Sequence, residues 1–299
     1  GITASELLSA ADLTMYDAKE AGRDRFALLD TTDFGSPRPG GQLAWADRIT
    51  EAIADDRFVL QAQPVMGARE GEIVGAELLL RMVDEDGEVV PPGRFLYIAE
   101  RLGLVTQLDT WVSGQAIALL EQVGRLNTDF HLEVNLSGHS IGDPELTNFL
   151  CTRIPEADID PSRLLFEMSE TAAVANIETA RDFAAQLANL GCRFALDDFG
   201  AGFGSFYYLK HLPFDVVKID GEFIEKSPTN TTDRLIVASI VSIARGLGKT
   251  TIAEFVSSEA ILTACRELGV DLVQGYHVGR PAPLDTVLQW AQRGRVREV

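Results

Sequence analysis

A set of polar residues stands where apolar segments of this 299-residue chain end. The set consists of Glu77, Asn135, Glu167, Asp197, Asp198, Lys218, Glu254 and Gln274. Carboxylates that converge in one cleft repel one another, so such a cluster needs a cation to neutralise it. The candidate ligands are all oxygens, with no histidine among them, which favours Mg²⁺ or Mn²⁺ over zinc.

The adjacent pair Asp197-Asp198 indicates a site for two metal ions. One of the two carboxylates can bridge both ions while the other binds one, an arrangement that phosphoryl-transfer enzymes use. Lys218 is the only cation in the set, and it can hold the attacking water or a phosphate oxygen. Together these residues predict hydrolysis of a phosphodiester.

Eight apolar segments carry these residues, and stretches with helical spacing separate them. The apolar segments are 58–65, 73–81, 131–137, 163–170, 193–200, 216–221, 250–256 and 272–279. Such alternation predicts an α/β fold with a parallel sheet and crossover helices, and eight units predict closure into a (β/α)8 TIM-like barrel. Catalytic groups of these barrels gather at the carboxyl ends of the strands, so we expect the polar set to meet at one mouth.

The composition limits the partners and the compartment. Asp and Glu total 45 against 26 Lys and Arg, a net charge of −19, which disfavours binding to a DNA or RNA duplex. The 3 cysteines show no paired spacing, which argues against a disulfide framework and a cysteine-based zinc site. No apolar run approaches the roughly 20 residues that cross a bilayer. We therefore expect a cytoplasmic domain, whose longer parent protein is free to carry a membrane anchor.

A stretch rich in Gly, Pro, Ser and Thr at residues 31–41 predicts a linker. It separates residues 1–30, which read as one helix and one strand, from a barrel domain at 42–299. One helix and one strand cannot bury a core, so we interpret the N-terminal piece as a fragment of another domain.

The motifs of the longer segment resemble those of EAL domains, phosphodiesterases that cleave the bacterial second messenger cyclic di-GMP to linear pGpG. The Glu-Ala-Leu that names the family reads Glu77-Leu78-Leu79 here, so the glutamate is kept and the alanine is replaced. The other matching motifs, in the family's order, are AQPV at 62–65, VNLS at 134–137, FEMSE at 166–170, LDDFGAGF at 196–203, KID at 218–220 and QGY at 274–276.

The resemblance implies a role for each matched residue. The implied metal ligands are Glu77, Asn135, Glu167 and Asp197 for one ion, and Asp197, Asp198 and Glu254 for a second. Glu254 or a metal-bound hydroxide would act as base, Lys218 would support the nucleophilic water, and Glu170 would anchor the loop after Asp198. The residues implied to position the substrate or neighbouring groups are Gln63, Arg81 and Gln274. The resemblance also implies a homodimer formed through the barrel.

One motif departs from the family, and this keeps a second function open. The family's AEGVET reads AEFVSS at 253–258, so Phe255 replaces a glycine and Ser257 replaces a carboxylate. A weakened member of the family would serve as a cyclic di-GMP receptor or regulatory module. Because every implied metal ligand is present, we favour the enzyme.

The N-terminal piece has a resemblance of its own. YDAK at 16–19 and GRDRF at 22–26 resemble the last helix and strand of a GGDEF domain, the diguanylate cyclase-like partner of many EAL domains. Residues 1–30 would then be its C-terminal remnant, and the parent a tandem GGDEF–EAL protein with upstream GGDEF or sensory domains.

Overall fold

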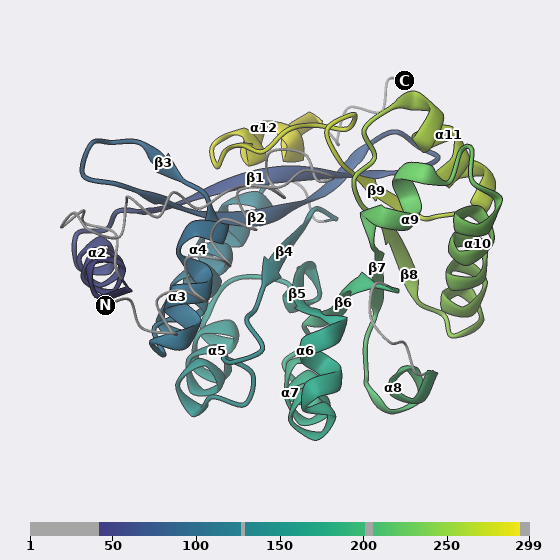
Figure 1. Cartoon of the computed structure of the whole chain (residues 1–299). Helices are drawn as coiled ribbons and strands as arrows, with labels where there is room; N and C mark the ends of the chain where they lie inside the picture. The colour runs from purple at the N-terminus through teal and green to yellow at the C-terminus, as the bar shows by residue number, and fades with distance from the viewer. Residues whose placement is uncertain (1–41, 127–128, 201–205, 294–299) are drawn as a thin grey trace, which may run out of the picture. The chain divides into compact units, whose positions relative to one another are not determined.

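The computed structural model describes residues 42–126, 129–200 and 206–293 (Figure 1). The proposed GGDEF remnant at 1–30 and the linker at 31–41 lie outside these residues. The chain divides into two compact units, and each is described by itself. The first comprises 1–59 and 80–108, and the second comprises 60–79 and 109–299.

The first unit contains short elements around a β-hairpin. Its described elements are α2 (Gln42–Ala54), the start of β1 (Phe58–Gly67), the end of β2 (Ile73–Val83), β3 (Val89–Val90), a 3₁₀ turn (Pro92–Arg94), α3 (Leu96–Arg101) and the first turn of α4 (Val105–Gly124). β2 and β3 pair in antiparallel register, with Met82 opposite Val90. The rings of Phe58 and Phe95 pack edge to face, with centroids 5.5 Å apart.

The second unit is a closed barrel of eight strands in the order β1-β2-β4-β5-β6-β7-β8-β9, and β9 pairs again with β1. The further strands are β4 (His131–Asn135), β5 (Leu164–Ser169), β6 (Arg193–Phe199), β7 (Val216–Ile219), β8 (Thr250–Ala253), β9 (Leu272–Gln274) and the short β10 (Ala282–Pro283), which pairs with β1. The predicted (β/α)8 TIM-like barrel is therefore confirmed, with its eight strands in the eight predicted segments.

One strand runs against the prediction of a parallel sheet. β1 pairs with β9 in antiparallel register, whereas β2 and β4 to β9 follow one another in parallel. The reason is the connection between β1 and β2 at residues 68–72, which is too short for a crossover helix and forms a hairpin instead. The correction concerns direction only, because β1 still occupies the predicted segment.

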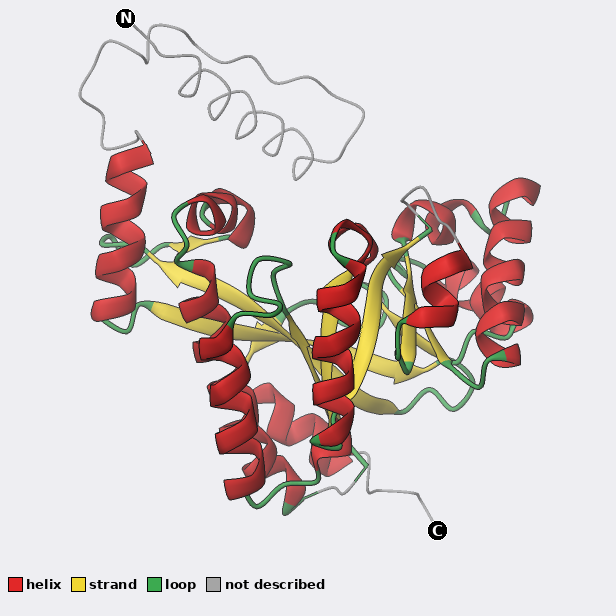
Figure 2. Ribbon diagram, turned by 90° about the horizontal axis from the view of Figure 1, so that it is seen from below, coloured by secondary structure: helices red, strands yellow, loops and turns green. Residues whose placement is uncertain are grey.

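Helices follow the parallel strands and flank them (Figure 2). Those after α4 are α5 (Pro144–Glu156), a 3₁₀ turn (Pro161–Arg163), α6 (Glu170–Ala175), α7 (Ile177–Asn189), α8 (Phe206–His211), α9 (Gly221–Lys226), α10 (Thr231–Gly246), α11 (Glu259–Leu268) and α12 (Thr286–Arg293). Capping side chains mark the start of several of these helices. The side chain of Asn230, for example, accepts hydrogen bonds from backbone nitrogens in the first turn of α10. α10 packs against both α9 and α11 (Figure 1). None of the described helices is both long and apolar enough to cross a bilayer.

An apolar layer fills part of the barrel. It consists of Val65, Leu165, Ala195, Val216 and Ile252, one residue from each of five strands, and all five are almost completely buried. Branched side chains in such a layer make the interior a packed core and not a pore. The polar residues of the site can be located from this layer, because they follow it two positions later on their strands.

Candidate active site at the barrel mouth

The site residues stand two positions beyond the apolar layer. Side chains alternate along a strand, so residues two apart point to the same side, here the barrel interior. The resulting pairs are Leu165 and Glu167, Ala195 and Asp197, Val216 and Lys218, and Ile252 and Glu254. β1 is antiparallel, so its site residue Gln63 precedes Val65, and this reversal brings Gln63 to the same end of the barrel.

Lys218 is the centre of a cage of carboxylates. Its side chain is fully buried. The carboxylate oxygens nearest to its Nζ belong to Glu167 at 2.8 Å, Glu254 at 3.1 Å, Glu77 at 3.8 Å, Asp197 at 3.8 Å and Glu133 at 3.9 Å. One ammonium therefore faces five carboxyl groups, four of which belong to the predicted set.

The cage shifts the pKa of each buried group. Burial lowers the pKa of Lys218, but the surrounding carboxylates, led by Asp197 and Glu167, outweigh burial and hold that pKa well above its ordinary value. Burial raises the pKa of Glu167 well above its ordinary value, although Lys218 opposes the shift. The pKa of Glu254 is raised well above its ordinary value for the same reasons. The site therefore has more negative charge than a single lysine stabilises.

Glu77 joins the cage to two side-chain amides. Asn135 Nδ2 donates a hydrogen bond to Glu77 Oε1 over 2.6 Å, and Gln274 Nε2 donates to Glu77 Oε2. Gln63 Oε1 lies 3.5 Å from the same Gln274 nitrogen, and Gln63 Nε2 donates to the carbonyl oxygen of Gly279. These four side chains, all predicted from the sequence, come together at the mouth.

A β-bulge aims the adjacent Asp197 and Asp198. Neighbouring residues of a regular strand point to opposite sides, so two successive ligands require a local irregularity. The register between β6 and β7 shifts between Leu196 and Phe199, and Asp198 has a left-handed backbone with φ 53°. Carboxylate oxygens of Asp197, Asp198 and Glu254 consequently lie within 4.8 Å of one another.

This acidic cluster fits a divalent cation. Glu167 Oε1 and Asp197 Oδ1 are buried and have no hydrogen-bond partner within the described part of the chain. Buried carboxylate oxygens without a partner are costly, and a cation would supply the missing interaction. The oxygen-only donor set is of the kind that hard divalent ions prefer. Three of the predicted ligands, Asp197, Asp198 and Glu254, thus form an acidic cluster that could bind a metal ion, and the full ligand set stays a prediction.

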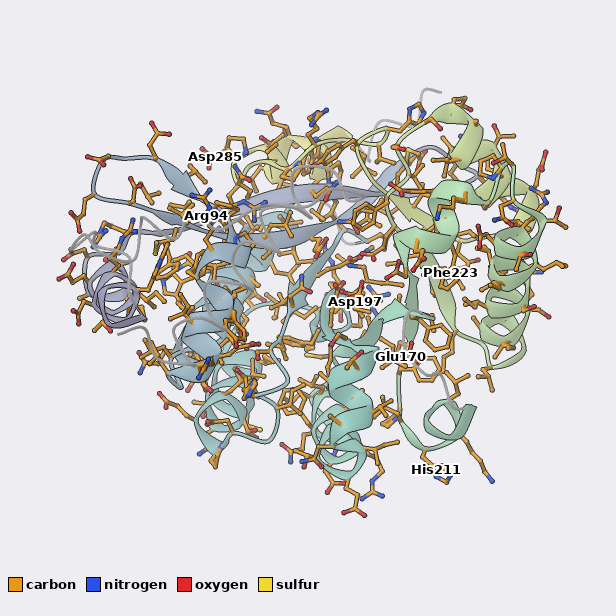
Figure 3. The ribbon with its side chains drawn as sticks, viewed as in Figure 1. Arg94, Glu170, Asp197, His211, Phe223 and Asp285 are labelled. Carbon is orange, nitrogen blue, oxygen red and sulfur yellow. The ribbon has the colours of Figure 1, made fainter. Side chains whose placement is uncertain are left out.

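Glu170 lies at the start of α6 and contacts the loop after β6. Its side chain is 2% exposed, and its Oε2 accepts a hydrogen bond from the backbone nitrogen of Gly200 over 2.8 Å. Figure 3 labels Glu170 and Asp197 on their neighbouring elements. This hydrogen bond reaches the backbone two residues after Asp198, while residues 201–205 lie outside the described part, so the anchoring of the loop stays a prediction.

Arg81 belongs to the first unit, unlike the other predicted site residues. Its guanidinium Nη1 donates to the carbonyl oxygen of Leu80 over 2.9 Å. A role for Arg81 toward substrate stays a prediction.

Glu133 and His131 form a buried pair that the sequence reasoning missed. Nε2 of His131 lies 2.8 Å from Glu133 Oε1. Burial by itself raises the pKa of Glu133, but the hydrogen bond with His131 and the charge of Lys218 lower that pKa to about 2. The carboxylate is thus ionised and accepts, so the imidazole donates. The available signal was the run of polar residues at 131, 133 and 135, which one face of a strand brings together.

Phe255 marks the departure from the family motif. Its backbone is left-handed, with φ 54°, a conformation that glycine adopts at little cost and a phenylalanine does not. The ring lies against Gly221 and leaves no room there for a side chain. The phenylalanine is therefore accommodated by the glycine at the first position of α9.

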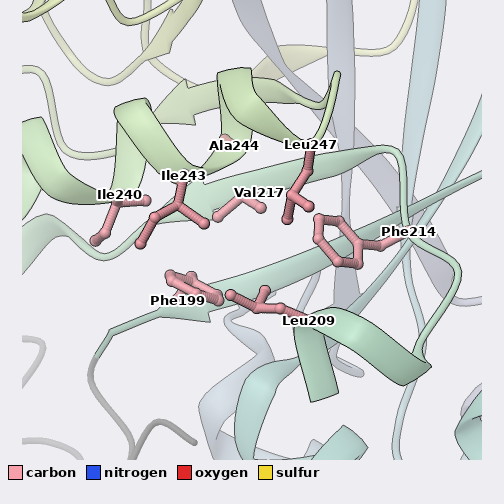
Figure 4. A pocket seen from close by; sticks show the side chains of 8 residues that line it. All are labelled: Phe199, Leu209, Phe214, Val217, Ile240, Ile243, Ala244 and Leu247. Carbon is pink, nitrogen blue, oxygen red and sulfur yellow. The ribbon is translucent and has the colours of Figure 1, made fainter. Parts of the chain in front are cut away.

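A pocket lined only by apolar side chains is shown in Figure 4. It is lined by Phe199, Leu209, Phe214, Val217, Ile240, Ile243, Ala244 and Leu247, which come from β6, β7, α8, α10 and the connections between them. None of these side chains carries a polar group that would orient a substrate. We assign it to packing.

Comparison with known sequences matches residues 46–281 to the family described as "EAL domain". The chain is 36% identical over 284 residues to "Cyclic di-GMP phosphodiesterase PdeB" of Shewanella oneidensis, covering 95% of this chain and 33% of that protein. It is 35% identical over 243 residues to "Cyclic di-GMP phosphodiesterase PdeF" of Escherichia coli, covering 81% and 32%. The chain thus spans about a third of the length of these two relatives.

Solved structures resemble the fold over most of the chain. "PaMucR Phosphodiesterase, c-di-GMP complex" has a TM-score of 0.76 at 31% identity, covering 81% of this chain and 98% of that chain. The FimX EAL domain from Pseudomonas aeruginosa bound to c-di-GMP has a TM-score of 0.74 at 30% identity, covering 80% and 96%.

Proposed function

We propose a hydrolytic function for this chain, which belongs to the EAL domain family. In this proposal the chain cleaves cyclic di-GMP to linear pGpG with the help of divalent metal ions. The observation that carries the proposal is the cluster of Asp197, Asp198 and Glu254 beside the buried Lys218. Relatives named cyclic di-GMP phosphodiesterases, and neighbours whose structures contain cyclic di-GMP, support the choice of substrate.

The proposed metal ligands are Glu77, Asn135, Glu167, Asp197, Asp198 and Glu254. The adjacency of Asp197 and Asp198 suits two ions, with Asp197 shared between them. Mg²⁺ or Mn²⁺ fits this oxygen-only set better than zinc. When bound, the ions would neutralise the carboxylates and polarise the phosphate that is attacked.

Glu254 and Lys218 are the proposed catalytic residues. Water attacks the phosphorus in line with the bond to the 3′-oxygen; that bond breaks, and the 3′-oxygen leaves as a hydroxyl by taking a proton from solvent. Glu254, whose Oε1 lies 3.1 Å from Nζ of Lys218, would take the proton that the water loses. The ammonium of Lys218, 3.1 Å from Glu254 Oε1, stabilises the negative charge that grows on the phosphoryl oxygens.

The remaining predicted residues would position these groups. Gln63 and Gln274, joined through their amides at the mouth, are placed to orient Glu77 and the substrate. Glu170 would hold the backbone after Asp198 through Gly200, and so keep the metal-binding bulge in place. A substrate contact from Arg81 rests on the family resemblance.

Incubation with cyclic di-GMP and Mg²⁺ or Mn²⁺, followed by chromatographic separation of pGpG, tests the proposal. We expect pGpG from the unchanged chain and none from Asp197→Asn, which keeps the shape of the side chain and removes its charge. Asp182→Asn is the matched control, because Asp182 pairs with Arg181 on the exposed side of α7. Chelation of the metal should stop the reaction of the unchanged chain and of Asp182→Asn.

Binding of cyclic di-GMP without formation of pGpG would replace the enzyme by a receptor, the alternative that Phe255 and Ser257 keep open. Failure to bind cyclic di-GMP at all would overturn both functions. Isothermal titration in Ca²⁺ separates binding from turnover, because Ca²⁺ fits a site of near-octahedral geometry poorly.

Partners other than the substrate are proposals from the resemblance alone. They are a second copy of the chain, bound through the barrel, and upstream GGDEF or sensory domains in the parent protein. Light scattering of the purified chain at several concentrations tests the dimer.

A further inference from the structure

Glu133 is a charged residue at a level of the barrel where the next strand carries an apolar one. In the register between β4 and β5 it stands opposite Leu165, a member of the apolar layer. Its side chain is fully buried. A charge in such a position costs free energy that an apolar residue of similar volume would avoid. The position therefore calls for an interaction that only a carboxylate provides.

His131 fixes the orientation of this carboxylate. The imidazole Nε2 donates to Glu133 Oε1 over 2.8 Å, and the ring occupies the space that a side chain at Gly75 would fill. Oε2 of Glu133 is buried and has no hydrogen-bond partner among the described residues. The cation nearest to it in the cage is Nζ of Lys218, 3.9 Å away.

The other four carboxylates around Lys218 are all proposed metal ligands. Once these carboxylates bind divalent ions, the ions neutralise their charge. The Lys218 ammonium then lies beside metal ions that repel it. Glu133 stands two positions before Asn135 on β4, below the proposed ligands, and is not one of them. It is the carboxylate of the cage that stays available to Lys218.

We infer that Glu133, oriented by His131, is a positioning residue that holds the Lys218 ammonium in place when the four other carboxylates bind metal. The inference rests on the proposed function for its catalytic consequence. Glu133 does not touch the substrate in this scheme, and its whole effect passes through Lys218. A residue that acts through one partner has no effect once that partner is removed.

A double-mutant cycle tests this dependence. We expect Glu133→Gln to lower kcat by about 10- to 100-fold with KM changed less than about 2-fold, the size of loss usual when a residue supporting a site residue is changed. In a Lys218→Met background the same substitution should cause no further loss. Glu156→Gln on the exposed face of α5 is the control for the chemical change and should leave kcat unchanged.

Substitutions of His131 supply a rescue experiment. His131→Leu removes the donor to Glu133 and should lower kcat as Glu133→Gln does. His131→Gln places an amide nitrogen near the position of Nε2 and should recover most of the loss. Equal losses for both substitutions would overturn the role of His131 as a hydrogen-bond donor.

A second measurement does not depend on activity. In the protein saturated with Mg²⁺, ¹H–¹⁵N correlation spectra of lysine ammonium groups should show a slowly exchanging signal that Lys218→Met removes. Glu133→Gln should shift and broaden it, and Glu156→Gln should not. An unchanged signal, or an additive loss of kcat in the cycle, overturns the inference. If the unchanged chain does not hydrolyse cyclic di-GMP, the proposed function fails and the spectra alone decide whether Glu133 holds Lys218.

Discussion

Removal of the single ammonium in the carboxylate cage should destabilise the metal-free protein strongly. Lys218 is fully buried and lies 2.8 Å from Glu167 and 3.1 Å from Glu254, so Lys218→Met leaves several carboxylates without a cation. Breaking a buried ion pair by removing one partner costs about 3–5 kcal/mol. For a chain of this size that loss lowers Tm by about 5–10 °C.

Thermal unfolding in EDTA and in millimolar Mn²⁺ measures this effect. Mn²⁺ supplies the positive charge that the variant lacks, so most of the loss in Tm should disappear when the ion is added. Lys226→Met is the matched control, since Lys226 is exposed in the last turn of α9 and should change the stability by less than about 0.5 kcal/mol. A Tm of Lys218→Met equal to that of the unchanged protein in EDTA would refute the cage, and a loss that Mn²⁺ leaves untouched would refute the metal assignment.

Three further outcomes are expected. Burial raises the pKa of Glu167 and Glu254. An acid whose pKa is higher in the folded state than the unfolded value of 4.5 binds more protons when folded, so its contribution to stability is lost as pH rises. Glu167→Gln should therefore raise Tm in EDTA more at pH 8 than at pH 5, and an equal effect at both pH values would contradict this. A maleimide should label Cys151 alone in the native protein and all 3 cysteines after denaturation, because Cys151 is exposed while burial raises the pKa of the other two thiols to about 12; mass spectrometry counts the labels. Val217→Ile adds one methyl group toward the apolar pocket and should stabilise the protein by about 0.8 kcal/mol in thermal unfolding, whereas a lower Tm would mean that the pocket is too small.

The barrel could be predicted because each strand carries its own signal. Apolar runs of strand length alternate with helical spacing along the chain, and this pattern needs no knowledge of distant contacts. The polar residues at the strand ends could be predicted for the same reason, since parallel strands bring their carboxyl ends to one mouth. Glu167 and Lys218 meet at 2.8 Å although 51 positions separate them in the chain.

Three features depended on contacts that periodicity does not encode. The direction of β1 is set by the length of its connection to β2. The direction of the Asp198 side chain depends on a β-bulge. The bulge is seen in the backbone conformation and in the register with β7, but the residue types do not indicate it. Glu133 was missed because it stands in the middle of its strand, where barrel interiors are usually apolar, and not at the strand end, where polar residues predict a site.

The antiparallel pairing of β1 with β9 has a consequence for synthesis on the ribosome. β1 and β2 can form their hairpin as soon as they emerge, because their contacts are local. The partner that completes the ring, however, is synthesised much later than β1: Gln63 and Gln274 are 211 positions apart. Until then β1 presents an unpaired edge, which is a template for association with other nascent chains. The amide that binds Glu77 is delivered by this same last strand, so the emerging chain completes its mouth and protects its edge in one event.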